Sequence, residues 1–348
     1  MINTIYIEDE VSNHPRVVEM TQRFPSAARV PCERYTAVFN LKGQNFRLQK
    51  HNPSLMLARK FDNFMLATPQ GYGIGGLHNY YFSHMLNCIY DCRYCFLQGM
   101  YRSAHYVVFV NYEDFFGAMD EKLVLHPQEN VWFFSGYDCD SLALEPVTGF
   151  TALLFPFLES RPRAMMELRT KSTHIQPLLG RDSLPNVIVA FSFTPAEISS
   201  QFEHKVPSVA KRVDAMAKLA AGGWRLGLRF DPLIYEEDFE SHYQKLFRQI
   251  FERVDSCAVH SVTIGPFRMP RGFFRNMVRL YPEEALLAGT FRNRDGVVSY
   301  NADREAAMLN FCIRQLKEYV APEIIYSCAP HSRPNLAGDS SDGLSVAI

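Results

Sequence analysis

The fold is decided by the stretch Asn87-Cys88-Ile89-Tyr90-Asp91-Cys92-Arg93-Tyr94-Cys95-Phe96-Leu97-Gln98, in which three cysteines lie within eight residues. This spacing is too compact for a disulfide framework. It is also one ligand short of the four that a structural zinc site or a closed iron–sulfur cluster takes from the protein. Because one ligand is missing, we predict a metal centre with one open coordination position. The alternatives are a zinc site completed by His84 or His105, or three structural cysteines.

The spacing Cys-x3-Cys-x2-Cys resembles the signature of radical S-adenosylmethionine enzymes. The resemblance implies that Cys88, Cys92 and Cys95 hold a 4Fe-4S cluster, whose open iron binds the amino and carboxylate groups of S-adenosylmethionine. In that family an electron from the cluster cleaves the sulfonium and gives a 5'-deoxyadenosyl radical. The cofactors would then carry the difficult chemistry, and the protein would position and shield them.

The composition fits a single enzyme without membrane segments. The chain has 348 residues, 47% of them hydrophobic, which suits one large domain with additions or two small domains. It lacks a run of about eighteen apolar residues and a secretory signal, so we expect a cytoplasmic protein. We also expect a monomer. The remaining five cysteines show no pairing pattern, as expected in a reducing compartment. The net charge of -1 means that any nucleic-acid binding must come from a local patch.

Alternating apolar runs and helical segments predict an α/β fold, a partial (β/α)6 TIM-like barrel with N-terminal and C-terminal additions. The expected strands are 80–86, 131–135, 165–170, 187–193, 225–230 and 261–265. The clearest helices are 112–124 and 207–220. We predict an N-terminal addition at 1–79, the barrel at 80–266, a C-terminal addition at 267–330 and a disordered tail at 331–348. Chemistry is expected at the C-terminal ends of the strands.

A basic patch lies late in the chain. Six arginines and only two acids occur between residues 268 and 294. If 272–280 is helical, Arg271, Arg275 and Arg279 share one face that could follow a phosphate backbone. Arg294 lies in a short hairpin nearby and is a fourth candidate. The alternative is an ordinary solvated helix face.

From about residue 80 to 326 the chain resembles the spore photoproduct lyase family. The resemblance rests on the cysteine loop ending in Phe96-Leu97-Gln98, on Arg169-Thr170-Lys171 and on Ser192-Phe193-Thr194-Pro195. Carried over, Lys171 and Ser192 would hold the polar end of S-adenosylmethionine, since an ammonium can pair with its carboxylate. Ser135 and Asp138, after the second strand, are further candidates for contacting the cofactor. Asp140, Asp231 and Arg229 are weaker candidates at strand ends.

In that family the adenosyl radical takes a hydrogen from carbon 6 of a methylene-bridged thymine dimer in ultraviolet-damaged DNA. A cysteine then returns a hydrogen to the product, and tyrosines near the cluster help to regenerate the cofactor. This sequence departs from the pattern: the hydrogen-donor cysteine falls on Tyr137, Cys139 follows two places later, and the second relay tyrosine is Phe96. We predict Tyr137 as hydrogen donor with Tyr94 as relay, and Cys139 as second choice.

The resemblance implies UV-damaged DNA as substrate and an electron donor such as flavodoxin or ferredoxin. Two alternatives stay open at this point. One is a radical enzyme acting on RNA or a nucleoside, and the other is a non-catalytic iron–sulfur protein that binds nucleic acid.

Overall fold

An open parallel sheet forms the centre of the molecule. The computed structural model describes residues 2–69 and 71–328, so the predicted tail at 331–348 lies outside the described residues. The sheet has the order β18-β14-β13-β11-β10-β9-β5-β4. Its strands are β4 (Leu66–Ala67), β5 (His78–Phe82), β9 (Val131–Ser135), β10 (Ala164–Thr170), β11 (Val187–Ser192), β13 (Arg225–Leu233), β14 (Val259–Pro266) and β18 (Ile325–Ser327). All pairings are parallel except that of β4 with β5.

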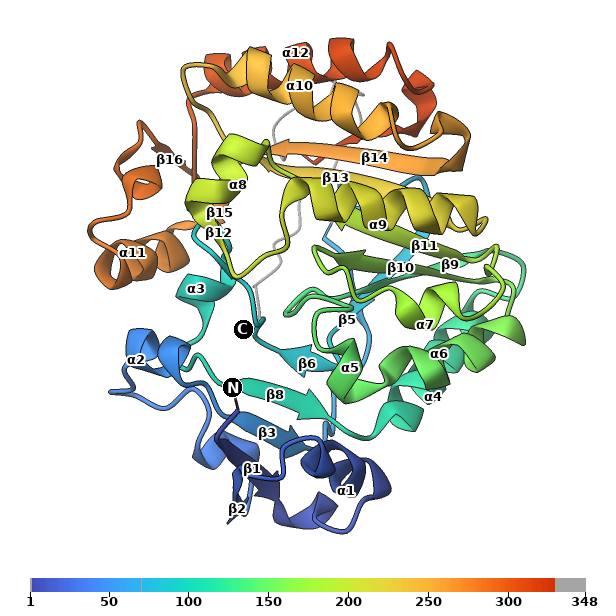
Figure 1. Cartoon of the computed structure of the whole chain (residues 1–348), viewed down its shortest axis with the longest axis vertical. Helices are drawn as coiled ribbons and strands as arrows, with labels where there is room; N and C mark the ends of the chain where they lie inside the picture. Colours follow the sequence, from blue (N-terminus) through green and yellow to red (C-terminus); the bar gives the residue numbers. More distant parts are fainter. Residues whose placement is uncertain (1, 70, 329–348) are drawn as a thin grey trace, which may run out of the picture.

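The six predicted strands lie side by side in chain order, which confirms the partial barrel. The first one is shorter than predicted, because the chain leaves this sheet after Phe82 and Met85–Leu86 form β6 in a different sheet. The edge strands β4 and β18 were not predicted. In Figure 1 the strands curl into an open half-barrel with helices on its outer face.

Helices cover the outer face of this sheet (Figure 1). They are α4 (Tyr112–Leu125), α6 (Phe150–Glu159), α9 (Val209–Ala221), α10 (Phe239–Phe251) and α12 (Ala302–Leu316). Helix α9 begins where the Ser208 hydroxyl accepts a hydrogen bond from the Lys211 N–H at 3.4 Å, and it ends at Gly222-Gly223, as predicted. Other helices are α1 (Pro15–Gln22), α2 (Phe46–His51), α3 (Leu97–Met100), α5 (Glu145–Thr148), α7 (Gln176–Leu179), α8 (Ala196–Phe202) and α11 (Arg271–Leu280). None of the described helices is both long and apolar enough to cross a membrane.

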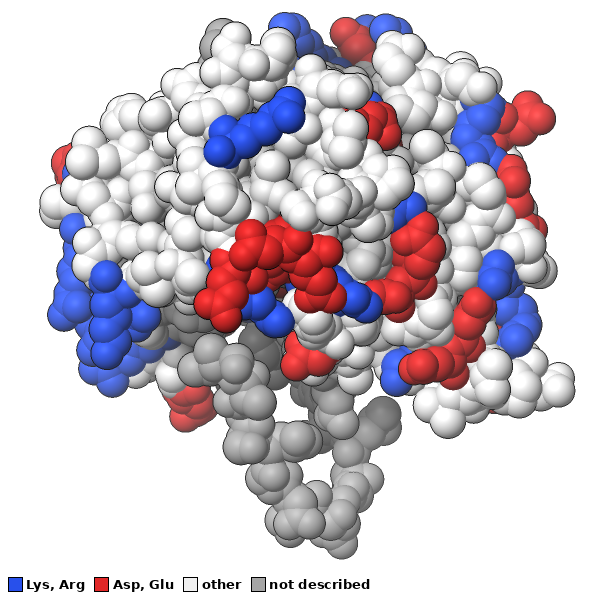
Figure 2. Space-filling model, turned by 90° about the horizontal axis from the view of Figure 1, so that it is seen from below, with Lys and Arg blue, Asp and Glu red and all other residues white. Residues whose placement is uncertain are grey.

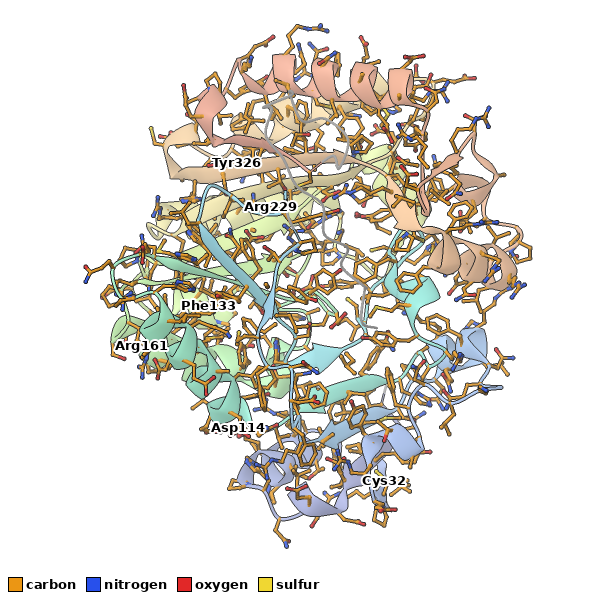
Figure 3. The ribbon with its side chains drawn as sticks, turned by 180° about the vertical axis from the view of Figure 1, so that it is seen from behind. Cys32, Asp114, Phe133, Arg161, Arg229 and Tyr326 are labelled. Carbon is orange, nitrogen blue, oxygen red and sulfur yellow. The ribbon has the colours of Figure 1, made fainter. Side chains whose placement is uncertain are left out.

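A second sheet carries the N-terminal part of the chain. Its order is β2-β1-β3-β8-β6, built from β1 (Thr4–Glu8), β2 (Ala28–Cys32), β3 (Leu55–Ala58), β6 and β8 (Tyr106–Phe109). Strands β6 and β8 come after residue 79, so strand pairing crosses the boundary that we placed there, and the division into domains stays a prediction. Figure 3 shows Cys32 in this sheet, far from Arg229 among the barrel strands.

The C-terminal addition combines α11 with a small antiparallel sheet of β15 (Arg268–Pro270), β16 (Arg292–Arg294) and β17 (Val297–Ser299). Strands β16 and β17 form the predicted hairpin. Its two turn residues, Asp295 and Gly296, have φ angles of 49° and 82°, the left-handed values that a two-residue hairpin turn needs.

Side chains fill the interior of the barrel in an apolar layer and a polar layer. Met165, Glu167 and Arg169 alternate along β10 and therefore face the same side. Met165 packs with Trp132 and Ile188 in an apolar floor. Above it, Glu167 and Arg229 form an ion pair at 2.7 Å, and neither side chain is exposed. Burial alone would raise the pKa of Glu167, but Arg229 and Arg169 outweigh it and lower that pKa to about 2.

Candidate functional site

A cavity of about 550 Å³ opens at the C-terminal ends of the parallel strands, and the three cysteines of the motif line it. Cys92 lies on β7 (Asp91–Cys92), which pairs antiparallel with β12 (Glu203–His204). The Arg93 N–H also donates to the Phe202 carbonyl at 2.8 Å. The cysteine loop is thus fixed against the segment that follows α8.

The surroundings of the three thiols suit a metal cluster. Burial raises the pKa of Cys88 to about 12 and that of Cys92 well above its usual value. Thiolates would therefore need nearby positive charge. Lys50 lies near Cys88, and Lys171 lies near Cys92, where each counteracts the effect of burial. The Tyr90 N–H also donates to the Cys88 sulfur at 3.4 Å. A cluster bound by all three thiolates would add the missing charge.

The geometry does not support a zinc site completed by His84 or His105. Among the described residues no three His, Cys, Asp or Glu side chains converge as a single ion requires. His84 is buried and stacks on Phe150 with ring centres 4.1 Å apart, and burial lowers its pKa to about 3. The His105 Nδ1 accepts a hydrogen bond from the Ser54 N–H at 3.0 Å. Neither histidine lines the cavity.

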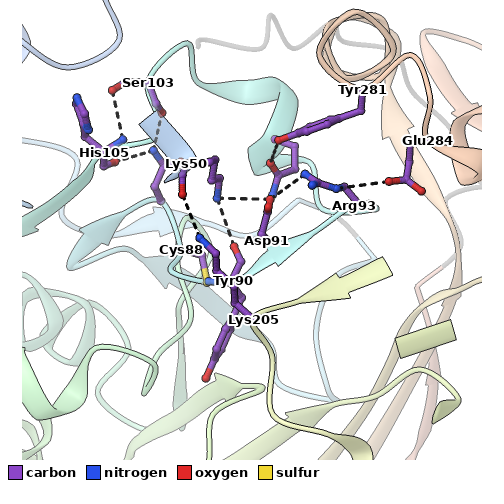
Figure 4. Close-up of polar contacts among 12 residues, drawn as sticks. Lys50, Cys88, Tyr90, Asp91, Arg93, Ser103, His105, Lys205, Tyr281 and Glu284 are labelled. Carbon is purple, nitrogen blue, oxygen red and sulfur yellow. Dashed lines mark hydrogen bonds and ion pairs between the residues drawn. The ribbon is translucent and has the colours of Figure 1, made fainter. Parts of the chain in front are cut away.

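A set of polar contacts holds the cysteine loop in place (Figure 4). Lys50 of α2 donates to the Tyr90 carbonyl at 3.4 Å and lies 3.8 Å from an Asp91 oxygen. Arg93 pairs with Asp91 at 3.1 Å and with Glu284, beyond α11, at 3.4 Å. The loop is therefore held between α2 and the segment that follows α11.

Three of the four predicted cofactor-binding residues line the cavity: Lys171, Ser192 and Ser135. Lys171 follows β10, its N–H donates to an Asp140 oxygen at 2.6 Å, and its ammonium has no ion-pair partner in the described part of the chain. The buried hydroxyls of Ser135 and Thr263 have no hydrogen-bond partner among the described residues, although both side chains line the cavity. Unpaired buried polar groups are costly, so these hydroxyls are suited to a bound ligand.

The position of Asp138 does not support its predicted role in cofactor binding. Asp138 does not line the cavity. Its N–H donates to the Ser83 hydroxyl at 3.1 Å, and burial raises the pKa of its carboxyl group. Asp140 lines the cavity instead, and it accepts hydrogen bonds from Thr170, Lys171 and two N–H groups after it. Asp140 thus holds the Lys171 loop, whereas Arg229 is buried against Glu167 and belongs to the core.

The three predicted catalytic residues all line the cavity, in different settings. Tyr137 is 46% exposed, and its ring lies 4.4 Å from that of Tyr81 and 5.5 Å from that of Phe96. Burial raises the pKa of Tyr137 to about 12. Cys139 is only 7% exposed, and burial, with Cys88 nearby, raises the pKa of its thiol. Tyr94 is buried and donates its phenolic proton to Glu203.

Sequence reasoning predicted only part of the polar group at the outer end of the cavity, the end marked by Tyr137 and Arg268: Asp231 was a weaker candidate, and its partners were missed. Arg268 forms a two-pronged ion pair with Asp231 at 2.8 and 3.1 Å and donates to the Tyr72 hydroxyl at 3.1 Å. All three residues line the cavity. Arg268 was visible as a member of the basic patch, but no spacing rule connects it to Asp231 or Tyr72, because the contacts join three separate segments.

The arginine face of α11 lies beside the cavity. Arg271, Arg275 and Arg279 are exposed and form no ion pair within the described ranges. On the other side of the helix, Phe273 lines the cavity. Figure 2 shows lysine and arginine side chains gathered at the left edge of its face, the side on which α2 and α11 lie in Figure 1. Arg294 differs from the other three because it pairs with Glu305.

Comparisons with known proteins agree with this geometry. The profile of a family described as spore photoproduct lyase matches residues 3–285. The spore photoproduct lyase of Bacillus subtilis is 23% identical over 265 residues, which cover 74% of this chain and 75% of that protein. That of a Geobacillus species is 23% identical over 177 residues, 51% of this chain and 52% of that protein. A mutant spore photoproduct lyase solved with AdoMet and dinucleoside spore photoproduct has the same fold, with a TM-score of 0.81 at 18% identity over 94% of this chain and 98% of that one.

Proposed function

This chain belongs to the spore photoproduct lyase family of radical S-adenosylmethionine enzymes, and from that premise we propose that it reverses a thymine photoproduct in ultraviolet-damaged DNA. One observation carries the proposal. The three thiols, the Lys171 ammonium and the hydroxyls of Ser135 and Thr263 all line one cavity, and neither the ammonium nor these hydroxyls have a partner among the residues that the structure describes. When bound, the 4Fe-4S cluster and S-adenosylmethionine supply a radical at the inner end of this cavity.

Different residues of the cavity would bind the cluster and S-adenosylmethionine. Cys88, Cys92 and Cys95 would hold the cluster, and they line the cavity together. The Lys171 ammonium pairs with the carboxylate of S-adenosylmethionine. Ser192 and Ser135 hydrogen-bond its polar groups.

At the outer end the chain handles the substrate. The exposed arginines of α11 bind phosphates of the DNA strand, so that a damaged base reaches the cavity past Phe273. Tyr72, Tyr81 and Tyr137 offer aromatic faces on which a base can stack. The electron for initiation comes from a carrier such as flavodoxin or ferredoxin, which stays a prediction, as do the cytoplasmic location and the monomeric state.

The decisive experiment is mass spectrometry of irradiated, thymine-containing DNA. Cluster-reconstituted protein is incubated anaerobically with the DNA, S-adenosylmethionine and dithionite, and Cys92→Ala protein is the control. We expect loss of one photoproduct with a matching gain of thymine, absent from the control. If 5'-deoxyadenosine accumulates while every lesion persists, the radical chemistry works but the substrate is another one, and RNA and nucleosides are tested next.

Hydrogen return is assigned to Tyr137, with Cys139 as second choice. Tyr137 is the more exposed of the two, so its O–H group can exchange with solvent between turnovers. In deuterated water we expect deuterium in the product thymine, lost in Tyr137→Phe protein and kept in Cys139→Ala protein. The opposite pattern would transfer the role to Cys139.

A further inference from the structure

A buried carboxylate contacts the phenol of Tyr94. Glu203 on β12 accepts hydrogen bonds from the Tyr94 hydroxyl, from the Ser199 hydroxyl at 2.6 Å and from Arg212 at 2.5 Å. The side chains of Glu203 and Arg212 are completely buried. Arg212 also donates to the Ser192 carbonyl at 2.7 Å. The carboxylate of Glu203 on β12 therefore connects the cysteine loop, α8 and α9 through hydrogen bonds.

Stability alone is a weak reason for such an arrangement. Taking two charges out of water costs about as much as their attraction returns, so a buried ion pair adds little net stability. A phenol could also donate to a neutral acceptor. What the carboxylate adds is the capacity to take up a proton. That capacity matters when a tyrosine loses an electron, because an oxidised phenol becomes a strong acid and its proton must leave at once.

We propose that Glu203 is the proton acceptor that allows Tyr94 to act as a one-electron relay. The proposal rests on the function given above and deepens it. Tyr94 gives one electron to the Tyr137 phenoxyl radical that remains after hydrogen return. The Tyr94 proton passes to Glu203, and Tyr137, which is 46% exposed, takes a proton from solvent. Tyr137 is thereby reduced and Tyr94 oxidised, with one proton moved inside the protein and one taken from water.

The structure explains why the acceptor must be internal. Tyr94 is only 6% exposed, so water cannot collect its proton freely. The Lys171 ammonium lies 5.5 Å from the centre of the Tyr94 ring, where a positive charge opposes loss of an electron. Arg212 and the Ser199 hydroxyl also donate hydrogen bonds to Glu203, so its two oxygens are arranged as acceptors. Glu203 is thus a positioning residue that acts through Tyr94.

The test does not need DNA or S-adenosylmethionine. The full chain carries 3-aminotyrosine at position 94, which is easier to oxidise than tyrosine, and a ruthenium photo-oxidant generates the radical there. In protein that retains Glu203, we expect the radical at position 94 to form at the same rate at each pH across the neutral range. In Glu203→Gln protein the amide still accepts the hydrogen bond but cannot take the proton. We expect a rate about a hundredfold lower that rises with pH as solvent base takes over.

Ser199→Ala is the matched control, because it removes another contact of the same carboxylate and leaves the proton acceptor. Its pH profile should follow that of the parent. Equal rates and profiles in Glu203→Gln and parent protein would overturn the proposal. If Glu203→Gln fails to fold, infrared difference spectra of the parent decide: oxidation should produce a protonated carboxyl band that shifts with 13C-glutamate, and its absence overturns the proposal. Both readouts are independent of lesion repair, so this proposal and the proposed function fail separately.

Discussion

The inner end of the cavity, at Cys88, Cys92, Cys95 and Lys171, and its outer end, at Tyr137 and Arg268, differ in how closely they follow the family pattern. At the inner end each residue type stands where the resemblance requires it, and the loop is tied down by pairing of β7 with β12. At the outer end a tyrosine replaces the expected cysteine and contacts a phenylalanine, Phe96. A cluster held by three thiolates depends on their fixed spacing, whereas hydrogen return can use an O–H or an S–H bond near the product. The two ends should therefore respond differently to substitution.

Replacing a cluster ligand should have the largest effect. Cys92→Ala removes one of three thiolates, and a cluster held by two ligands should be lost together with all activity. Iron and sulfide content, with the visible absorbance of reconstituted protein, measure this. Cys257→Ala is the control, because Cys257 is exposed and far from the motif in sequence. Full iron content in Cys92→Ala protein would contradict the assignment of Cys92 as a cluster ligand.

Lys171→Met should weaken cofactor binding without loss of the cluster. A hydrogen bond to a charged group contributes about 1.5–3 kcal/mol, so binding of S-adenosylmethionine should weaken about 10–100-fold. Equilibrium dialysis measures the affinity, and the iron content shows that the cluster remains. Lys211→Met, on the exposed face of α9, should bind normally. An unchanged affinity for S-adenosylmethionine in Lys171→Met protein would mean that Lys171 does not bind this cofactor.

The outer end can be tested through salt. With Arg271, Arg275 and Arg279 all replaced by glutamine, the slope of log Kd against log salt for duplex DNA should fall by about one for each lost phosphate contact. Fluorescence anisotropy at several salt concentrations gives the slope. The control replaces Lys211, Lys218 and Arg248, which are exposed on α9 and α10, and so removes the same charge elsewhere. Equal slopes for the two triple variants would mean that α11 presents only a solvated face.

The sequence was sufficient for the features that depend on local pattern. Cysteine spacing predicted the cluster loop, and β-branched and aromatic runs predicted six strands of the barrel. Strands β4 and β18 were missed because runs of two or three residues carry no readable period. Asp138 was favoured over Asp140 because nothing local shows how the chain turns after Gly136, whose φ of 85° redirects the loop. The contacts of Glu203 and Arg268 join segments far apart in sequence, so only the folded structure reveals them.

Replacing Arg294 should have the smallest effect on DNA binding. The result shows whether the proposed DNA-binding surface ends at α11. The sequence analysis grouped Arg294 with the arginines of α11. In the structure it lies on β16, outside that helix, and it pairs with Glu305. Its charge is already balanced, so Arg294→Gln should change the salt slope by much less than one. Loss of this partly exposed ion pair should cost about 0–1 kcal/mol of stability. Anisotropy and thermal unfolding measure the two quantities. A slope change as large as that of Arg275→Gln would extend the DNA-binding surface from α11 to the hairpin.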